Sequence, residues 1–381
     1  MASRVRRRLL RLLGRPPGDW AGADGAREAA RAALPVERDD AFEVVVFEDE
    51  LPAGDPLLRQ LRESGHRLFR ASGDSFDILD RLRREHRLGA TVVLGRRGRA
   101  LDVIERLDWV SLSLDASADA ATLEAKMTDA FPLASIVIVT HDNLDLNRLC
   151  LESLVARTEW PGYEVIVVDN GSADGTPEML ARFAAAHPRV RVRALPENRG
   201  FPAAVNLALA GAAGDPVVLL NNDTVLTRGW LTGLRRHLAA DPALGLVGPV
   251  TNAIANEARI DAGYADVRQL PAWAAAWTRA HDGESFDISM LAFFCVAIRR
   301  RTLAEVGPLD ERFGLGLFED GDYNRRVRAA GWRVCCARDV FVHHWQNASF
   351  RRLGKDAYFA LYEENRRKFE EKWGAAPSPP H

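Results

Sequence analysis

The chain contains 381 residues, more than one typical domain, which predicts two or three packed units. Hydrophobic residues make up 47% of it and charged residues 27%, so collagen-like and predominantly disordered proteins are excluded. The 51 Lys and Arg against 53 Asp and Glu leave a formal charge of -2, so no chain-wide charge favours nucleic acid and we expect no nucleic-acid partner.

Residues 1–40 are predicted to form a basic N-terminal tail and linker. Arginines alternate there with Leu9, Leu10, Leu12 and Leu13, a pattern typical either of contact with an anionic membrane surface or of a frayed tail that its charges solvate. No apolar run reaches the ~18 to 20 residues of a membrane span, no signal peptide is recognisable, and the four cysteines are too few for a disulfide framework. We expect a cytoplasmic protein, with peripheral contact at the inner face of the membrane as one of the two alternatives for the tail.

Residues 41–130 are predicted to form a small α/β accessory domain with a connecting helix. Short apolar runs alternate with helical stretches, which is the rhythm of strand-helix-strand units. The runs are 44–47, 67–69, 91–94 and 110–112, and the helical stretches lie around 56–64, 76–86, 99–106 and 118–131. The segment has no dinucleotide fingerprint, phosphate loop or acid-base cluster, so we expect the main site elsewhere.

A larger domain is predicted over residues 131–350, followed by a C-terminal helix and tail over 351–381. Its first half repeats a buried strand and a helix four times, and the strands lie at 135–139, 165–168, 190–192 and 217–220. Polar residues gather where these strands end. The pattern predicts an open, doubly wound, mostly parallel sheet, whose ligand crevice lies at the carboxyl ends of the strands.

Asp223 follows the fourth of these buried strands, beside Asn222 and ahead of Thr224. A carboxylate at this edge can face the crevice and bind Mg²⁺ or Mn²⁺, because these ions prefer oxygen ligands and commonly bridge protein carboxylates to phosphates. The alternative is that the segment is a turn or a helix N-cap.

Three carboxylates crowd the start of a predicted helix, at Glu319, Asp320 and Asp322. A helix N-terminus stabilises a carboxylate, which keeps it ionised and able to act as a general base. The alternative is helix capping together with ion pairs to arginines one turn later, such as Arg326. We prefer that alternative for Asp322 and the base for Asp320.

His343 and His344 close a short strand, and Ser349 follows. A lone histidine is usually a core or surface group, but an imidazole at a strand end can complete a metal shell with Asp223. Sites for hard ions more often use oxygen alone.

Taken in order, these landmarks resemble an inverting family 2 glycosyltransferase of the GT-A fold, over the chain from Ser135 onward. The matching segments are 137–140, 168–172, 198–200 with Asn206, 222–223, 248–252, 319–320, and His344 with Ser349. The stretches 248–260 and 342–350 resemble a bacterial, rhamnosyltransferase-like subgroup that builds cell-surface polysaccharides.

The resemblance implies transfer from a nucleotide-diphosphate-sugar to a hydroxyl of a cell-surface glycan or glycolipid, with Mn²⁺ or Mg²⁺ as cofactor. Asp320 carries over as the general base, with Glu319 beside it in the same motif. Asp223 and His344 carry over as metal ligands, and the spacing to Ser349 favours His344 over His343. The donor-binding residues implied are Thr140, His141, Asp142, Asp169, Arg199, Asn222 and Asp223.

The chain departs from the family pattern at two positions. It has His141-Asp142 where many relatives have Tyr-Asn, so an imidazole would pack on the nucleobase, and it has Asn222-Asp223 instead of a double aspartate. Two other functions compete. A sugar-1-phosphate nucleotidyltransferase would be expected to carry a Gly-rich phosphate loop where this chain has residues 140–143, and a non-catalytic glycan-binding or scaffold protein would not need Asp223, Asp320 and His344 together.

Overall fold

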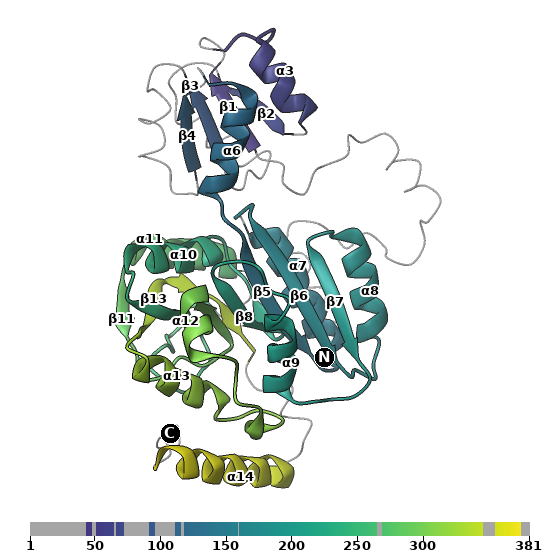
Figure 1. Cartoon of the computed structure of the whole chain (residues 1–381), viewed down its shortest axis with the longest axis vertical. Coiled ribbons are helices and arrows are strands. Elements are labelled where there is room, and N and C mark those ends of the chain that lie inside the picture. The colour runs from purple at the N-terminus through teal and green to yellow at the C-terminus, as the bar shows by residue number, and fades with distance from the viewer. Residues whose placement is uncertain are drawn as a thin grey trace. The chain divides into compact units, whose positions relative to one another are not determined.

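The computed structural model describes residues 43–47, 51–64, 66–71, 91–95, 111–115, 118–158, 160–264, 269–345 and 355–374. The chain divides into two compact units (Figure 1), a smaller one of Pro17–Pro132 with Glu159–Gly162 and a larger one that contains Leu133–Thr158 and Tyr163–His381. The predicted tail at 1–40 and the predicted helices at 76–86 and 99–106 lie outside the described residues. None of the described helices is both long enough and apolar enough to cross a bilayer.

The smaller unit contains a four-stranded parallel sheet in the order β2-β1-β3-β4. Its strands are β1 (Glu43–Phe47), β2 (Arg67–Ala71), β3 (Thr91–Gly95) and β4 (Ser111–Asp115), and its helices are α3 (Pro56–Glu63) and α6 (Ala120–Ala130). In β1 and β3 the apolar runs of the sequence supply buried side chains, Val45 and Leu94 among them. Asp55 caps α3, since its Oδ1 accepts a hydrogen bond from the Leu57 N–H at 2.9 Å.

The larger unit is built on an eight-stranded sheet in the order β11-β13-β10-β12-β8-β5-β6-β7. The strands are β5 (Ala134–Thr140), β6 (Tyr163–Asn170), β7 (Val190–Leu195), β8 (Val217–Asn221), β10 (Leu244–Val250), β11 (Ser285–Asp287), β12 (Cys295–Ile298) and β13 (Arg333–Phe341). Only β11 and β12 run antiparallel to their neighbours. The predicted α/β, mostly parallel architecture is confirmed.

Helices lie on both faces of this sheet, with α9 on one face and α7 on the other (Figure 1). The helices are α7 (Leu144–Arg157), α8 (Thr176–Ala186), α9 (Phe201–Leu209), α10 (Trp230–Ala240), α11 (Leu270–Ala280), α12 (Arg300–Val306), α13 (Glu319–Ala329) and α14 (Lys355–Trp373), with a 3₁₀ turn η2 (Glu311–Phe313). Burial on both faces explains why the central residues of β5, β6 and β8 are Val, Ile and Leu.

Strand register brings the polar strand ends to one edge of the sheet. Thr140 pairs with Asp169 across β5 and β6, and Val139 pairs with Asn221 across β5 and β8. A second, two-stranded sheet pairs β9 (Thr224–Val225) with β14 (His343–His344), so that His344 lies opposite Thr224. Segments 120 residues apart in the sequence therefore meet beside the end of β8.

Candidate active site

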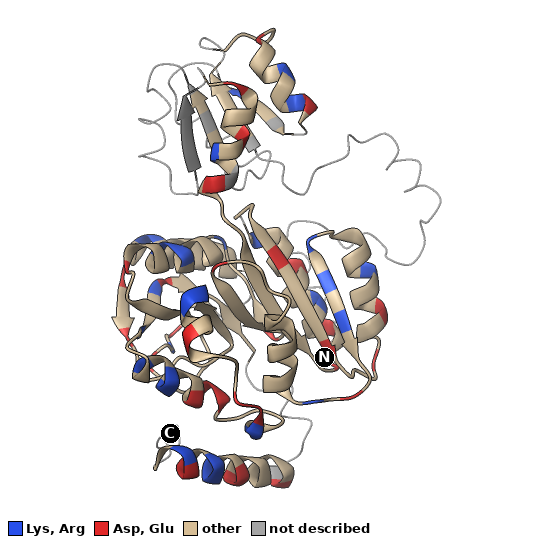
Figure 2. Ribbon diagram, in the orientation of Figure 1, with Lys and Arg blue, Asp and Glu red and all other residues tan. Residues whose placement is uncertain are grey.

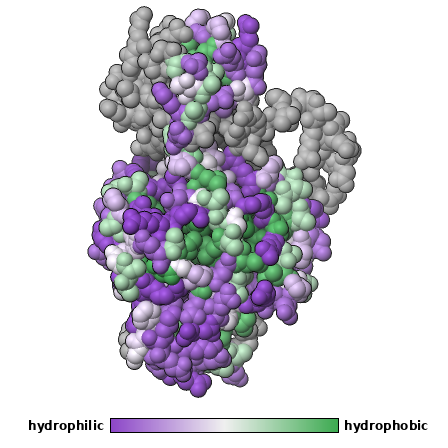
Figure 3. All heavy atoms as spheres, in the orientation of Figure 1, coloured by the Kyte–Doolittle hydropathy of each residue, from purple (hydrophilic) through white to green (hydrophobic). Residues whose placement is uncertain are grey.

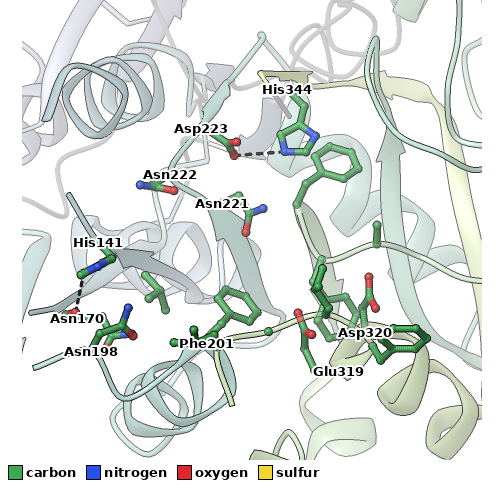
Figure 4. A pocket seen from close by; sticks show the side chains of 18 of the residues that line it. His141, Asn170, Asn198, Phe201, Asn221, Asn222, Asp223, Glu319, Asp320 and His344 are labelled. Carbon is green, nitrogen blue, oxygen red and sulfur yellow. Dashed lines mark hydrogen bonds and ion pairs between the residues drawn. The ribbon is translucent and has the colours of Figure 1, made fainter. Parts of the chain in front are cut away.

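A cavity of about 520 Å³ lies at the carboxyl ends of β5, β6 and β8. Its wall includes seven of the residues that the sequence predicts for the site, namely His141, Asp142, Asn222, Asp223, Glu319, Asp320 and His344. Figure 4 shows Asp223 and His344 on one side of the cavity, and Glu319 and Asp320 on another. The place agrees with the rule that ligands of open α/β sheets bind outside the carboxyl ends of the strands.

The pairing of β9 with β14 sets Asp223 beside His344. The Asp223 Oδ1 atom lies 3.2 Å from the His344 Nε2 atom, and both residues are about 6% exposed. Oδ1 is buried and accepts no hydrogen bond. The Asp223 backbone is fixed as well, because its carbonyl accepts a hydrogen bond from the Trp345 N–H at 2.9 Å.

The surroundings of His344 determine which of its ring nitrogens carries hydrogen. Nδ1 lies 2.9 Å from the Ala253 carbonyl oxygen, which can only accept, so Nδ1 must be the donor. The ring also stacks on Phe294, with centroids 5.0 Å apart. In the neutral ring, Nε2 therefore presents a lone pair toward the Asp223 carboxylate.

Two lone pairs at 3.2 Å repel unless a cation lies with them, and that cation is either a proton on Nε2 or a metal ion. A carboxylate oxygen and an imidazole nitrogen whose other nitrogen is anchored to a carbonyl are suitable ligands for a divalent transition metal such as Mn²⁺. The pair thus fits a divalent ion. Among the residues that the structure describes, no group of three or more His, Cys, Asp and Glu side chains is placed to hold a metal.

His343 faces a different part of the structure. Its Nδ1 lies 2.6 Å from the Tyr264 hydroxyl, and it lines a separate cavity together with Tyr264 and Arg259. Burial, and then the neighbouring His344, lower its pKa to about 4. His343 is therefore neutral near pH 7 and lies outside the wall of the main cavity.

Glu319 and Asp320 stand in the first turn of α13. Asp320 Oδ1 accepts a hydrogen bond from the Gly321 N–H at 2.7 Å, whereas the buried Glu319 Oε2 has no partner. Burial raises the pKa of both carboxyl groups, and the neighbouring Asp320 charge raises that of Glu319 further. A carboxyl group with a raised pKa is a stronger proton acceptor near neutral pH than an ordinary one.

Asp322 has the structural role that the sequence favours for it. Its Oδ2 accepts a hydrogen bond from Arg326 Nε at 2.9 Å, one turn along α13. Its Oδ1 accepts one from Trp373 Nε1 at 2.8 Å and lies 2.6 Å from Lys372 Nζ, both on α14. These contacts confirm the predicted pairing with Arg326 and add a link to α14 that the sequence does not reveal.

The loops after β5 and β6 form another wall of the cavity. His141 Nδ1 lies 3.0 Å from the Asn170 carbonyl oxygen, as Figure 4 shows. The Asp142 carboxylate accepts hydrogen bonds from the N–H groups of Ala173 and Asp174 at 2.8 and 3.3 Å. Asp142 thus ties the loop after β5 to the loop after β6.

Three predicted donor-binding residues lie outside the cavity wall. Asp169 is 2% exposed, and its Oδ1 accepts hydrogen bonds from the hydroxyls of Thr140 at 3.2 Å and Ser172 at 2.5 Å. Arg199 is exposed, and its backbone N–H donates to Asn170 Oδ1 at 2.9 Å. Thr140, Asp169 and Arg199 therefore shape the loops around the cavity from outside it.

The cavity wall also contains residues that the sequence did not single out as site residues. They are chiefly Asn170, Asn198, Phe201, Phe294 and the 315–318 segment. Asn170 and Asn198 stand inside motifs that the sequence does mark, so their position was a usable signal. The 315–318 segment directly precedes the predicted acid cluster, which was a usable signal as well, whereas nothing in the sequence marks Phe294.

Comparison with known proteins identifies the family. Residues 135–307 match the model of Glycosyl transferase family 2. The chain is 32% identical over 225 residues to Glycosyltransferase AglE of Haloferax volcanii, covering 57% of this chain and 68% of AglE. The chain belongs to glycosyl transferase family 2. The family predicted from the motifs is thus confirmed, and a family 2 transferase is favoured over both competing functions.

Other relatives of this family 2 glycosyltransferase are more distant or longer. It is 28% identical to N-acetylglucosaminyl-diphospho-decaprenol L-rhamnosyltransferase of Mycobacterium tuberculosis, over 59% of this chain and 79% of that protein. It is 30% identical to uncharacterized protein y4gI of Sinorhizobium fredii, of which it spans 25%. Among solved structures, it is similar to the mannosyltransferase PcManGT from Pyrobaculum calidifontis in complex with GDP-Man and Mn²⁺, at 23% identity and a TM-score of 0.46, covering 65% of this chain and 66% of that one.

Proposed function

We propose that this family 2 glycosyltransferase moves a sugar, with inversion, from a nucleotide-diphosphate-sugar to a hydroxyl of a cell-surface glycan or glycolipid, with Mn²⁺ or Mg²⁺ bound. The observation that carries the proposal is the pairing of two kinds of group on one cavity. Asp223 and His344 fit a cation, and Glu319 and Asp320 supply two adjacent carboxyl groups with raised pKa values.

Asp223 and His344 would hold the metal ion on the diphosphate of the donor. When bound, the ion offsets the negative charge that develops on the departing nucleoside diphosphate. The hydrogen bond from His344 Nδ1 to Ala253 and the stacking on Phe294 hold the ring so that Nε2 faces Asp223. The two ligands are therefore oriented before donor binds.

Asp320 would act as the general base. The acceptor hydroxyl attacks the anomeric carbon, its proton passes to the Asp320 carboxylate, and the bond from that carbon to the diphosphate oxygen breaks. A single displacement of this kind inverts the anomeric centre. The Gly321 N–H holds one Asp320 oxygen at 2.7 Å and leaves the other for the proton.

The wall formed by the loops after β5 and β6 would bind the nucleoside. His141 offers a flat ring for a base. The Asn170 amide braces this wall, because its Nδ2 donates hydrogen bonds to Asn198 Oδ1 at 2.9 Å and to the Gly200 carbonyl at 3.2 Å. The buried cluster of Asp169 with Thr140 would keep this wall in place, and the exposed Arg199 would approach the donor from its edge.

The acceptor class is inferred from relatives. One relative is named as a rhamnosyltransferase acting on N-acetylglucosaminyl-diphospho-decaprenol, and RfbC of Myxococcus xanthus, 29% identical over 58% of this chain, is named for O-antigen biosynthesis. Both names support a glycolipid or surface-glycan acceptor. A cytoplasmic location, with the basic tail of residues 1–40 at the inner face of the membrane, stays a prediction.

A donor panel with Mn²⁺, read by release of free nucleoside diphosphate, tests the proposal. We expect Asp320→Asn to keep donor affinity and lose at least about 100-fold in turnover, because a general base contributes ~10²–10⁴ in rate. Asp223→Ala should weaken donor binding, measured by calorimetry, only when metal is supplied. Asp145→Asn, the same chemical change at an exposed position of α7, is the matched control. Wild-type turnover by Asp320→Asn would refute the assignment of the base.

A further inference from the structure

The segment between η2 and α13 has an unusual backbone. Four of its five residues have positive φ values: 56° at Gly314, 123° at Gly316, 76° at Leu317 and 74° at Phe318. Positive φ is uncommon for bulky residues, and two such residues in succession are a strained arrangement that the surroundings must impose. This segment leads directly into Glu319 and Asp320 and itself lines the cavity.

A single side chain of α14 holds this strained backbone. Asn365 is fully buried, and its Nδ2 donates hydrogen bonds to the carbonyl oxygens of Phe313, Gly316 and Leu317 at 2.8, 2.7 and 3.3 Å. The opposite amide orientation would face its oxygen toward three carbonyl oxygens, so the contacts fix the orientation of the amide. One residue thus bonds to both ends of the strained turn.

Aromatic packing from α14 supports the same segment. The Phe318 ring lies 5.2 Å from Tyr362 and 5.6 Å from Phe369, between ring centroids. Phe369 is fully buried and reaches the first turn of α13, since a Cβ added at Gly321 would lie 3.3 Å from its ring. The face of α14 that carries Asn365 and Phe369 therefore packs against the residues that flank Asp320.

Ion pairs near the end of α14 also hold this helix against the residues on either side of the strained segment. Lys372 makes ion pairs with Asp310 and Asp322, which precede and follow the strained segment. Figure 2 shows both signs of charge along α14, and Figure 3 shows a largely hydrophilic surface over this region. The polar residues of α14 face solvent while Asn365 and Phe369 face the 314–318 segment.

We propose that Asn365 is a positioning residue of the transferase, which holds the 314–318 segment in the conformation that sets Glu319 and Asp320 on the cavity wall. The inference rests on the proposed function, in which Asp320 is the base. Asn365 is not part of the cavity wall, and its Nδ2 hydrogen bonds go to backbone carbonyls.

The test compares Asn365→Ala and Asn365→Asp with Lys368→Ala. Lys368 makes another hydrogen bond from α14, to the Arg312 carbonyl at 2.8 Å, without touching Gly316 or Leu317. We expect the Asn365 variants to lose at least about tenfold in kcat, with affinity for the nucleoside diphosphate plus Mn²⁺ within about twofold of wild type. Lys368→Ala should keep wild-type kcat.

Two readouts separate positioning from general stability. Amides 314–321 should exchange hydrogen faster in the Asn365 variants, with other regions unchanged. Water admitted by the loosened segment should remove the burial that raises the pKa of Asp320, so the acid limb of kcat should move to lower pH. Unchanged exchange at 314–321, or equal losses in kcat and in nucleotide affinity, would overturn the inference.

If both Asn365 variants fail to fold, Tyr362→Leu provides the test, because it removes an aromatic neighbour of Phe318 and leaves Asn365 unchanged. It should lower kcat and speed exchange at 314–321, and wild-type values for both would overturn the inference. A wild-type protein inactive with every donor would count against the proposed function alone, because the exchange measurement still reports whether Asn365 holds the segment.

Discussion

Gly200, at the start of α9, closely approaches Gly314 in the segment that leads to the proposed base. It has φ 86° and ψ 161°. A Cβ placed there would lie 2.1 Å from the Gly314 carbonyl oxygen and 2.6 Å from its carbon, both backbone atoms. We predict that Gly200→Ala moves the 314–318 segment and impairs transfer more than it impairs folding of the sheet.

Gly307 provides a matched control for the backbone part of this effect. It has φ 82° and ψ -169°, a similar conformation, but a Cβ there would meet nothing within 4 Å. Alanine in this region of φ and ψ costs about 1–3 kcal/mol at either site. Gly200→Ala adds an overlap that needs a shift of at least about 1 Å, and such overpacking costs about 1–3 kcal/mol more.

Denaturant unfolding measures the stability cost of each substitution, and steady-state kinetics measure its effect on kcat. Gly307→Ala should lower the free energy of unfolding by about 1–3 kcal/mol and keep wild-type kcat. Gly200→Ala should lose more stability and about 100-fold in kcat, because a displacement of ~1 Å at a catalytic group can reduce the rate by that factor. Equal stability losses in the two variants, or wild-type kcat in Gly200→Ala, would refute the claim that this close approach positions the base.

Two further predictions concern buried charges. Burial raises the pKa of Asp320, so the stability that its carboxyl group contributes is complete below the pKa of the unfolded chain and is lost as pH rises through the pKa of the folded protein. Asp320→Asn should therefore raise Tm relative to wild type near pH 8 and not near pH 4. The same Tm difference between variant and wild type at both pH values would contradict this. Asp339 is 1% exposed and accepts hydrogen bonds from His237 Nε2 at 2.7 Å and from the Gly283 N–H at 2.9 Å. Asp339→Asn should therefore lower the free energy of unfolding, measured in urea, by about 3 kcal/mol. The affinity for the nucleotide-sugar should stay unchanged.

The strands β5, β6 and β8 could be predicted because their central residues are buried on both faces. The runs at 136–139, 165–168 and 217–220 are apolar and are followed by polar residues, which indicates both the element type and the edge where the site lies. The antiparallel strand β12 could not be predicted in its place between β8 and β10. A four-residue apolar run contains no information about direction, and only the pairing with Leu220 and its neighbours defines it.

The meeting of Asp223 with His344 depends on a pairing that no local pattern encodes. Strands β9 and β14 have two residues each, too short for periodicity, and their register is what brings the side chains to 3.2 Å. The chemistry of the residues suggested a cation site and the spacing to Ser349 favoured His344 over His343, while the alternation of side chains along β14 supplies the physical reason. Adjacent residues of a strand face opposite ways, so only one of the two can meet Asp223.

Four consecutive residues, 317–320, each depart from ordinary backbone or side-chain preferences. Leu317 and Phe318 have positive φ values, Glu319 has a buried oxygen without a partner, and Asp320 has a raised pKa. Each departure destabilises the fold, and a sequence read locally would assign none of them. The contacts that offset them come from α14, through Asn365 and the aromatic neighbours of Phe318. A substitution in α14 should therefore be judged by what it does to the acid pair as well as by the contacts it removes.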